Sequence, residues 1–317
     1  MGKLENNFTW SSSRDGTFQR CLRQYWWQYY GSWGGWDRDG DPEAREAYIL
    51  KNLSTRWAWV GSAVHDAIEG ILRRQLDSAG RADELSFERP RPVVLDVEGE
   101  VEALTQRMRE QFAASRDRAY RQQPKRVLGL QEHEYADAVP RSEWAAMSDK
   151  AREALRGWLQ SPLAARIRAS DPRQWLPIET LDSFEFEGTP VWAVLDFGMR
   201  TEGGGAEIYD WKTGAVDPQG NRAQLVCYAL YVQARFSVPT DLVTTRLVYL
   251  GRQVEVHDVR LAPTDLEEVG AQMRASIAAM RSRLADPQAN VARREDFPLT
   301  DDLETCRSCS FRRLCHR

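Results

Sequence analysis

Long hydrophobic runs are missing from this chain of 317 residues. No stretch approaches the ~18 consecutive apolar residues that a membrane-spanning helix requires. The opening residues, MGKLENNFTW, also lack the basic and apolar regions of a secretion signal. We therefore expect a cytoplasmic protein. In that reducing compartment, cysteines bind metals more often than they form disulfides.

The chain also has no phosphate-binding loop of the form G-x-x-x-x-G-K-S/T. Without that loop it has no nucleotide-driven motor of its own. A formal net charge of -4 excludes a surface that is basic throughout. A basic patch is nevertheless expected at the C-terminus, because no acidic residue follows Glu304 there. The arginines of this patch are Arg307, Arg312, Arg313 and Arg317.

Helical periodicity dominates the first half of the chain. The apolar spacing predicts helices over 10–30, from about Trp57 to Leu76, over 96–125 and over 142–168. The first helix follows a serine run, Ser11 to Ser13, and is dense in aromatic residues. We interpret 76–170 as a mostly helical insertion. A hydrophobic content of 42% is enough for a sizeable core, in one large domain or two smaller ones.

From Trp175 onward the apolar pattern changes to the alternation that is typical of strands. We expect a β-meander from the segments PIETLDSFEFEG, TPVWAVLDFGMR and AEIYDWKTG. A helix over 219–235 and a hairpin over 242–261, with its turn near Gly251 and Arg252, should follow. Thr264 and Glu267 predict a capping box for a last amphipathic helix. This pattern indicates an α/β protein.

Two aspartates flank a glycine-rich turn in VWAVLDFGMRTEGGGAEIYDWKTG. If the turn centres near Gly203, Asp196 and Asp210 lie opposite each other and project to the same side. Lys212 shares that face, and Trp211 points to the other. Because the two carboxylates repel each other, this arrangement favours a bound divalent cation such as magnesium or manganese. The alternative is an ordinary surface Asp–Lys pair, and these residues alone favour neither interpretation.

Three of the five cysteines lie within the last twelve residues, at Cys306, Cys309 and Cys315. Such clustering indicates a disulfide, a metal site or an iron-sulfur cluster. The spacing alone does not decide among the three.

The segments GSAVHDAIEG, LDFG, YDWKTG and AQLVCYALY occur in this order. Together they resemble the PD-(D/E)XK nuclease superfamily, in its RecB-type and CRISPR-associated exonuclease branch. The resemblance implies a restriction-endonuclease-like core, in which helices flank a central mixed β-sheet. That core would comprise 61–75 and 171–262. The aromatic segment 1–60, the insertion 76–170 and the C-terminal segment 263–317 would surround it.

The resemblance also assigns roles to residues that match the motifs. It implies that the metal ligands are His65, Asp196, Asp210 and the backbone carbonyl of Trp211. Lys212 would be the catalytic lysine, which orients the attacking water or holds the cleaved phosphate. Glu179, in the segment PIETL, is a further acidic candidate.

Gln224 and Tyr228 would, by the same resemblance, contact nucleic acid near the cut. Residues four apart on a helix share a face, which agrees with a common role. The alternative is an ordinary amphipathic helix that packs Tyr228 into the core.

In this branch, one cysteine before the nuclease core and a Cys-x2-Cys-x5-Cys set after it hold a 4Fe-4S cluster. The implied ligands are Cys21, Cys306, Cys309 and Cys315, and they would tie the N-terminal helix to the C-terminal tail. One departure is Leu22, where the family commonly has proline after the first cysteine. Zinc is the alternative occupant, with His316 able to replace Cys21. Cys227 is left over, as an expected core residue.

The expected activity is that of a magnesium- or manganese-dependent deoxyribonuclease. It would be an exonuclease on single-stranded DNA or DNA ends, in repair, recombination or antiviral defence. Trp33 and Trp36, in a glycine-containing loop, could stack on unpaired bases. Unwinding would need a partner such as a helicase. The alternative is a non-catalytic iron-sulfur or zinc subunit that binds nucleic acid within a larger DNA-processing complex, although the complete set of Asp196, Asp210 and Lys212 argues against it.

Overall fold

The computed structural model describes residues 4–81, 95–217 and 220–317, and over these residues it is an α/β protein. Its central element is a four-stranded sheet of order β5-β6-β7-β8. The strands are β5 (Phe197–Arg200), β6 (Ala206–Lys212), β7 (Val243–Tyr249) and β8 (Glu255–Val259). Strands β6 and β7 are parallel, whereas the two outer pairs are antiparallel. The expectation of a mixed sheet flanked by helices is therefore confirmed.

The expected β-meander is wrong, because β3 (Asp182–Phe186) and β4 (Thr189–Ala193) form a separate two-stranded sheet. The second edge of β4 pairs with Trp10, whose carbonyl accepts a hydrogen bond from Trp192 N. Because Trp10 occupies that edge, β5 does not pair with β4. The segment PIETL does not join a strand either, since Glu179 has a left-handed φ of 44°.

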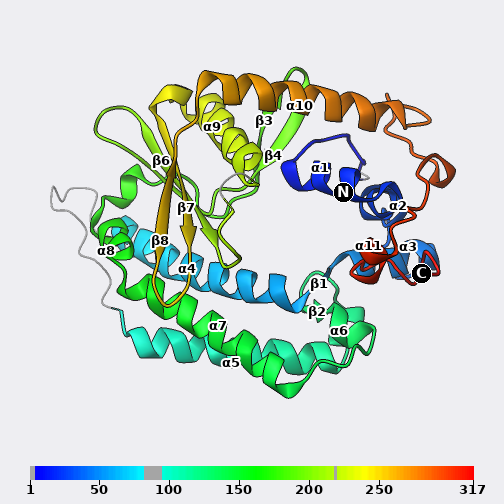
Figure 1. Ribbon diagram of the computed structural model, residues 1–317, viewed down its shortest axis with the longest axis horizontal. Coiled ribbons are helices and arrows are strands. Elements are labelled where there is room, and N and C mark those ends of the chain that lie inside the picture. Colours follow the sequence, from blue (N-terminus) through cyan, green and yellow to red (C-terminus); the bar gives the residue numbers. More distant parts are fainter. Residues whose placement is uncertain (1–3, 82–94, 218–219) are drawn as a thin grey trace.

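Helices cover both faces of the central sheet (Figure 1). Helix α9 (Arg222–Phe236) provides the crossover that the parallel strands β6 and β7 require, and it packs with α10 (Pro263–Ser282) on one face. Helix α4 (Arg56–Arg81) covers the other face, with α5 (Val97–Arg116) and α7 (Arg141–Gln160) behind it.

Side chains alternate between these two layers along β6, as a strand dictates. Ile208 belongs to the core beneath α9, whereas Tyr209 and Trp211 belong to the core beneath α4. Asp210 consequently faces the α9 side. The hairpin of β7 and β8 has its register centred on residue 252, since Thr245 pairs with Val259, which confirms the expected turn.

Several expected helices differ from those observed. The helix expected over 10–30 is broken at Cys21, whose extended φ of -161° ends α1 (Ser12–Arg20) and begins α2 (Leu22–Trp26). The helix expected over 142–168 is interrupted between α7 and α8 (Pro162–Ala169). There Pro162 lacks the N–H to continue α7, and Ser161 caps α8 by accepting a hydrogen bond from Ala164 N.

The other helix boundaries shift by smaller amounts. Helix α5 ends at Arg116, so the helix expected over 96–125 is too long. The start expected at 219 for α9 lies outside the described residues. The capping box of Thr264 and Glu267 is wrong, because the Asp265 carboxylate instead accepts a hydrogen bond from Ala262 N at 2.7 Å.

The two ends of the chain lie side by side (Figure 1). After α2 come a π-helix, η1 (Trp27–Gly31), and α3 (Pro42–Lys51). Phe311, which follows α11 (Leu303–Arg307), is buried against Trp27 and Leu50. Direct apolar packing therefore joins the two terminal segments.

The remaining elements are short. They are β1 (Leu53–Ser54), β2 (Gly129–Leu130), α6 (Gln131–Glu134), and 3-10 turns at Ala119–Arg121, Pro172–Gln174, Thr240–Leu242 and Arg294–Asp296. Within the described chain, no helix combines the length and apolarity needed to cross a bilayer. The expected division at residues 60, 75, 170 and 262 stays a prediction, and residues 82–94 of the insertion lie outside the described ranges.

Candidate active site

Strands β5 and β6 bring the two aspartates together. Their register pairs Phe197 with Tyr209, so Asp196, immediately before β5, comes opposite Asp210. Asp196 Oδ2 accepts a hydrogen bond from Trp211 N at 2.6 Å. Both carboxylates are buried, with 7% of Asp196 and 1% of Asp210 exposed.

Helix α4 places His65 beside these carboxylates from the opposite layer. His65 Nε2 lies 2.9 Å from the carbonyl oxygen of Trp211, and Nδ1 lies 3.6 Å from Asp196 Oδ1. A carbonyl only accepts hydrogen bonds, so Nε2 carries a proton. In neutral His65, the Nδ1 lone pair then faces Asp196 and is free to bind a cation. The Trp211 carbonyl, expected as a metal ligand, here accepts the His65 hydrogen bond.

Glu179 completes this group from the loop before β3. Its Oε1 lies 3.4 Å from His65 Nδ1 and is buried without a hydrogen bond of good geometry in the described chain. The left-handed backbone of Glu179 is uncommon for a residue other than glycine, and such strain concentrates at functional sites. The sequence alone assigns little weight to Glu179, because a single glutamate carries no spacing pattern.

Lys212 lies on the α9 side of the sheet, in a closed ring of contacts. Its Nζ is 2.6 Å from Asp210 Oδ2 and donates a hydrogen bond to Gln224 Oε1 at 3.0 Å. Gln224 Nε2 donates to the Tyr228 hydroxyl at 2.7 Å, and that hydroxyl donates to Asp210 Oδ1 at 3.3 Å. Gln224 and Tyr228 are four residues apart and therefore lie on the same face of α9. The ring orients the lysine toward Asp210.

The candidate site buries more carboxylates than positively charged side chains. Burial raises the pKa of Asp196 well above its usual range, and the charges of Asp210 and Glu179 raise it further. Burial also raises the pKa of Asp210, although Lys212 opposes the shift. For His65, burial would lower the pKa, but Glu179 and Asp196 together raise it to about 9.

These residues fit a divalent cation. One ligand atom from each of His65, Glu179 and Asp196 lies within 4.8 Å of the others. Oxygen ligands with one imidazole suit magnesium or, better, manganese. A doubly charged ion would also neutralise the carboxylates that otherwise repel one another. Asp210, the other expected carboxylate ligand, lies outside this group and pairs with Lys212.

The four cysteines expected to hold a cluster line one small cavity between the two ends of the chain. They are Cys21, Cys306, Cys309 and Cys315, and all are free thiols. Burial raises the pKa of Cys309 to about 12.

The sulfur positions do not match the geometry of a single zinc ion. Around one zinc ion, the sulfurs would lie about 3.8 Å apart, given zinc–sulfur bonds of about 2.3 Å. No three of the described cysteine sulfurs come within 4.8 Å of one another. The described cysteines therefore lack a preformed zinc geometry.

The aromatic segment of the N-terminus divides into two parts. Trp27 is fully buried, whereas Trp33 and Trp36 are 39% and 41% exposed and pack edge to face with each other. In the C-terminal patch, Arg312 lies over the ring of Tyr135 and pairs with Asp137. Part of the expected basic patch is thus engaged within the protein.

The family model for the PD-(D/E)XK nuclease superfamily matches residues 9–316. The chain therefore belongs to that superfamily, whose members are nucleases that use divalent metals. No curated protein matches the chain significantly. A solved structure described as "Crystal structure of SSO0001" is similar over 78% of this chain and 95% of its own, at 15% identity and a TM-score of 0.29. A likeness at that score supports no conclusion about the fold or the function of this chain.

Proposed function

We propose that the protein is a magnesium- or manganese-dependent deoxyribonuclease that hydrolyses phosphodiester bonds. The observation that carries this proposal is the convergence of two buried aspartates, Lys212 and the His65–Glu179 pair on one end of the sheet. Burying like charges together costs stability, and proteins keep such groups mainly at functional sites. Superfamily membership makes phosphodiester hydrolysis the chemistry it would serve.

Each residue has a proposed role. His65, Glu179 and Asp196 would hold the cation through Nδ1 and carboxylate oxygens. Asp210 would hold Lys212 and become a further ligand when the cation binds. A cation held there supplies an activated water and neutralises charge on the cleaved phosphate. Lys212 would orient that water or hold a phosphate oxygen, since its side chain is only 23% exposed and its Nζ is held by two acceptors.

We further propose that the substrate is single-stranded DNA or a DNA end. Trp33 and Trp36 are exposed on a loop, and aromatic faces can stack only on unpaired bases. The chain has no motor motif, so a helicase or another DNA-processing partner would supply unwound strands. We propose a role for this activity in repair, recombination or antiviral defence.

We also propose that the cysteine cavity holds a 4Fe-4S cluster in the native protein. Support comes from the four cysteines that line one cavity. A cluster would add covalent ligation to the packing of Phe311 on Trp27. Anaerobically purified protein should then contain about four irons per chain and absorb near ~400 nm. Stoichiometric zinc without iron would overturn this part.

The activity is tested by incubating anaerobically purified protein with end-labelled single- and double-stranded DNA. Each substrate is incubated with magnesium, with manganese and with chelator. We expect cleavage of the single strand with either metal and none with chelator. In His65→Ala, the rate with manganese should fall more than the rate with magnesium, because imidazole favours the softer ion. Equal cleavage with and without chelator would contradict the proposed metal dependence.

A further inference from the structure

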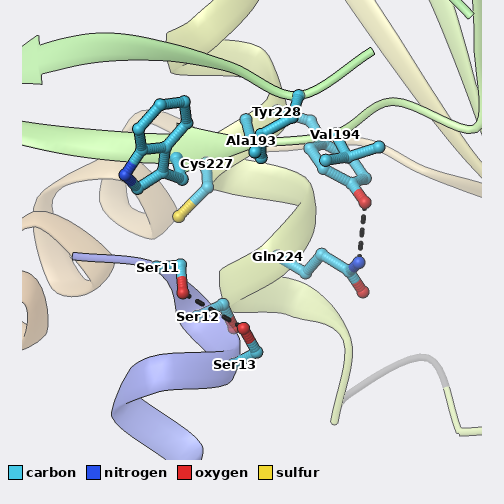
Figure 2. A pocket seen from close by; sticks show the side chains of 10 residues that line it. Ser11, Ser12, Ser13, Ala193, Val194, Gln224, Cys227 and Tyr228 are labelled. Carbon is cyan, nitrogen blue, oxygen red and sulfur yellow. Dashed lines mark hydrogen bonds between the residues drawn. The ribbon is translucent and has the colours of Figure 1, made fainter. Parts of the chain in front are cut away.

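A cavity of about 390 Å³ opens beside the candidate active site, within the size range of small-ligand sites. It lies between the start of α1, strand β4 and helix α9, and Gln224 and Tyr228 form part of its wall (Figure 2). Gln224 accepts a hydrogen bond from Lys212 Nζ at 3.0 Å. A ligand in this cavity would therefore be one side chain away from the proposed site of cleavage.

The walls of the cavity differ in chemistry. Trp192 and Leu181, which line one part, are 38% and 63% exposed. Trp192 occupies a solvent-facing position of β4, where the strand alternates between buried and exposed residues. Trp192 and Leu181 together therefore leave an apolar surface that is open to a ligand in this cavity.

Serine hydroxyls form another part of the wall (Figure 2). The Ser11 and Ser13 hydroxyl oxygens lie 3.1 Å apart. The Ser12 hydroxyl makes no hydrogen bond to any residue that the structure describes, so it is available to a ligand. This wall can therefore donate and accept hydrogen bonds.

The residues that line the cavity are all uncharged. A phosphate group buried here would lose its hydration without gaining a counter-charge, which is unfavourable. The base and sugar of a nucleotide have the matching character, with an apolar face for the indole ring and polar edges for the hydroxyls.

We propose that this cavity is a nucleoside subsite next to the cleaved phosphodiester. The base stacks on Trp192, and Ser12 faces its polar edge. This inference rests on the proposed nuclease function, because it assigns the neighbouring phosphate to the Lys212 site. The subsite selects bases outside a duplex, since a base within a duplex has both faces stacked on its neighbours and its pairing edge occupied.

The test compares two single-stranded oligomers of equal length in the presence of chelator. One is oligothymidylate, and the other has the same backbone without bases. In Trp192→Ala, the Kd for oligothymidylate should rise about 5- to 150-fold, as the loss of one stacked base implies. The Kd for the abasic oligomer should not change. Trp192→Phe should recover most of the loss, and Trp57→Ala should bind as wild type does, because Trp57 is 54% exposed on α4 outside this cavity.

An equal loss of affinity for both oligomers in Trp192→Ala, or no loss for either, would overturn the subsite. If Trp192→Ala does not fold, Trp192→Thr takes its place, since threonine suits a solvent-facing strand position. Binding in chelator separates the two proposals. A base-dependent loss in a protein that cleaves no DNA with any metal would refute the nuclease function and leave the subsite standing.

Discussion

Removing the hydroxyl of Tyr228 should impair catalysis while leaving the fold intact. Burial and the charge of Asp210 raise the pKa of Tyr228, so its hydroxyl stays protonated and can donate to that carboxylate. The hydroxyl also accepts from Gln224, which in turn holds Lys212. In Tyr228→Phe both contacts are lost, and the lysine loses part of its support.

The magnitude follows from the geometry. A hydrogen bond to a charged group is worth about 1.5 to 3 kcal/mol, and the long Tyr228–Asp210 distance of 3.3 Å favours the lower end of that range. About 1.4 kcal/mol corresponds to a factor of ten, so kcat for single-strand cleavage should fall about tenfold. Because the lost bond lowered the pKa of Asp210, the acidic limb of the pH–rate profile should move to higher pH.

Tyr231→Phe is the matched control. Tyr231 is on the same helix, is 2% exposed, and donates its hydroxyl proton to Asp182 Oδ2 at 3.1 Å, outside the candidate site. Both variants should lose similar stability in thermal unfolding, and only Tyr228→Phe should lose activity. Wild-type kcat and pH profile in Tyr228→Phe, or an equal loss in Tyr231→Phe, would refute the reasoning.

Three further perturbations give separate tests. Asp196→Asn should raise the melting temperature of the metal-free protein at neutral pH and should remove the stabilisation of the protein by manganese. Burial raises the pKa of Asp196, so the wild-type carboxylate lowers the stability of the fold as pH rises through that pKa. Manganese affinity, measured by calorimetry, should rise with pH in wild type as protons leave His65. The affinity should fall in Glu179→Gln, and an unchanged affinity in that variant would remove Glu179 from the ligand set. Cys309→Ser should lose iron and thermal stability, whereas Cys227→Ala should retain its iron, because Cys227 is buried outside the cysteine cavity.

Features that depend on local pairing could be predicted from the sequence. The symmetric spacing of Asp196 and Asp210 around Gly203 predicts the register of β5 and β6, because a short antiparallel connection fixes which residues meet. Alternation then places the Trp211 side chain on the other face of the sheet from Asp210, as observed. The spacing of Gln224 and Tyr228 predicts a shared helix face, and the two side chains are hydrogen-bonded. The catalytic and binding roles of these residues stay predictions.

Features that depend on contacts between distant residues could not be predicted from the sequence. The pairing of β4 with Trp10 joins residues far apart in the sequence, and no local pattern favours it over the expected meander. Glu179 reaches His65 only because its backbone adopts a left-handed conformation. The break in the helix at Cys21 could not be predicted, because aromatic residues continue at helical spacing on both sides of it.

The central claim is that the Asp196–Asp210–Lys212 constellation hydrolyses DNA with a divalent metal. Its most direct test is the single-turnover rate of manganese-dependent cleavage of labelled single-stranded DNA by wild type, Asp210→Asn and the control Asp182→Asn. Asparagine keeps the size of the side chain and removes the charge, and Asp182 likewise pairs with a cation, Arg235, but lies outside the site. The account predicts cleavage by wild type and Asp182→Asn and none by a folded Asp210→Asn. Cleavage at the wild-type rate by Asp210→Asn would contradict it.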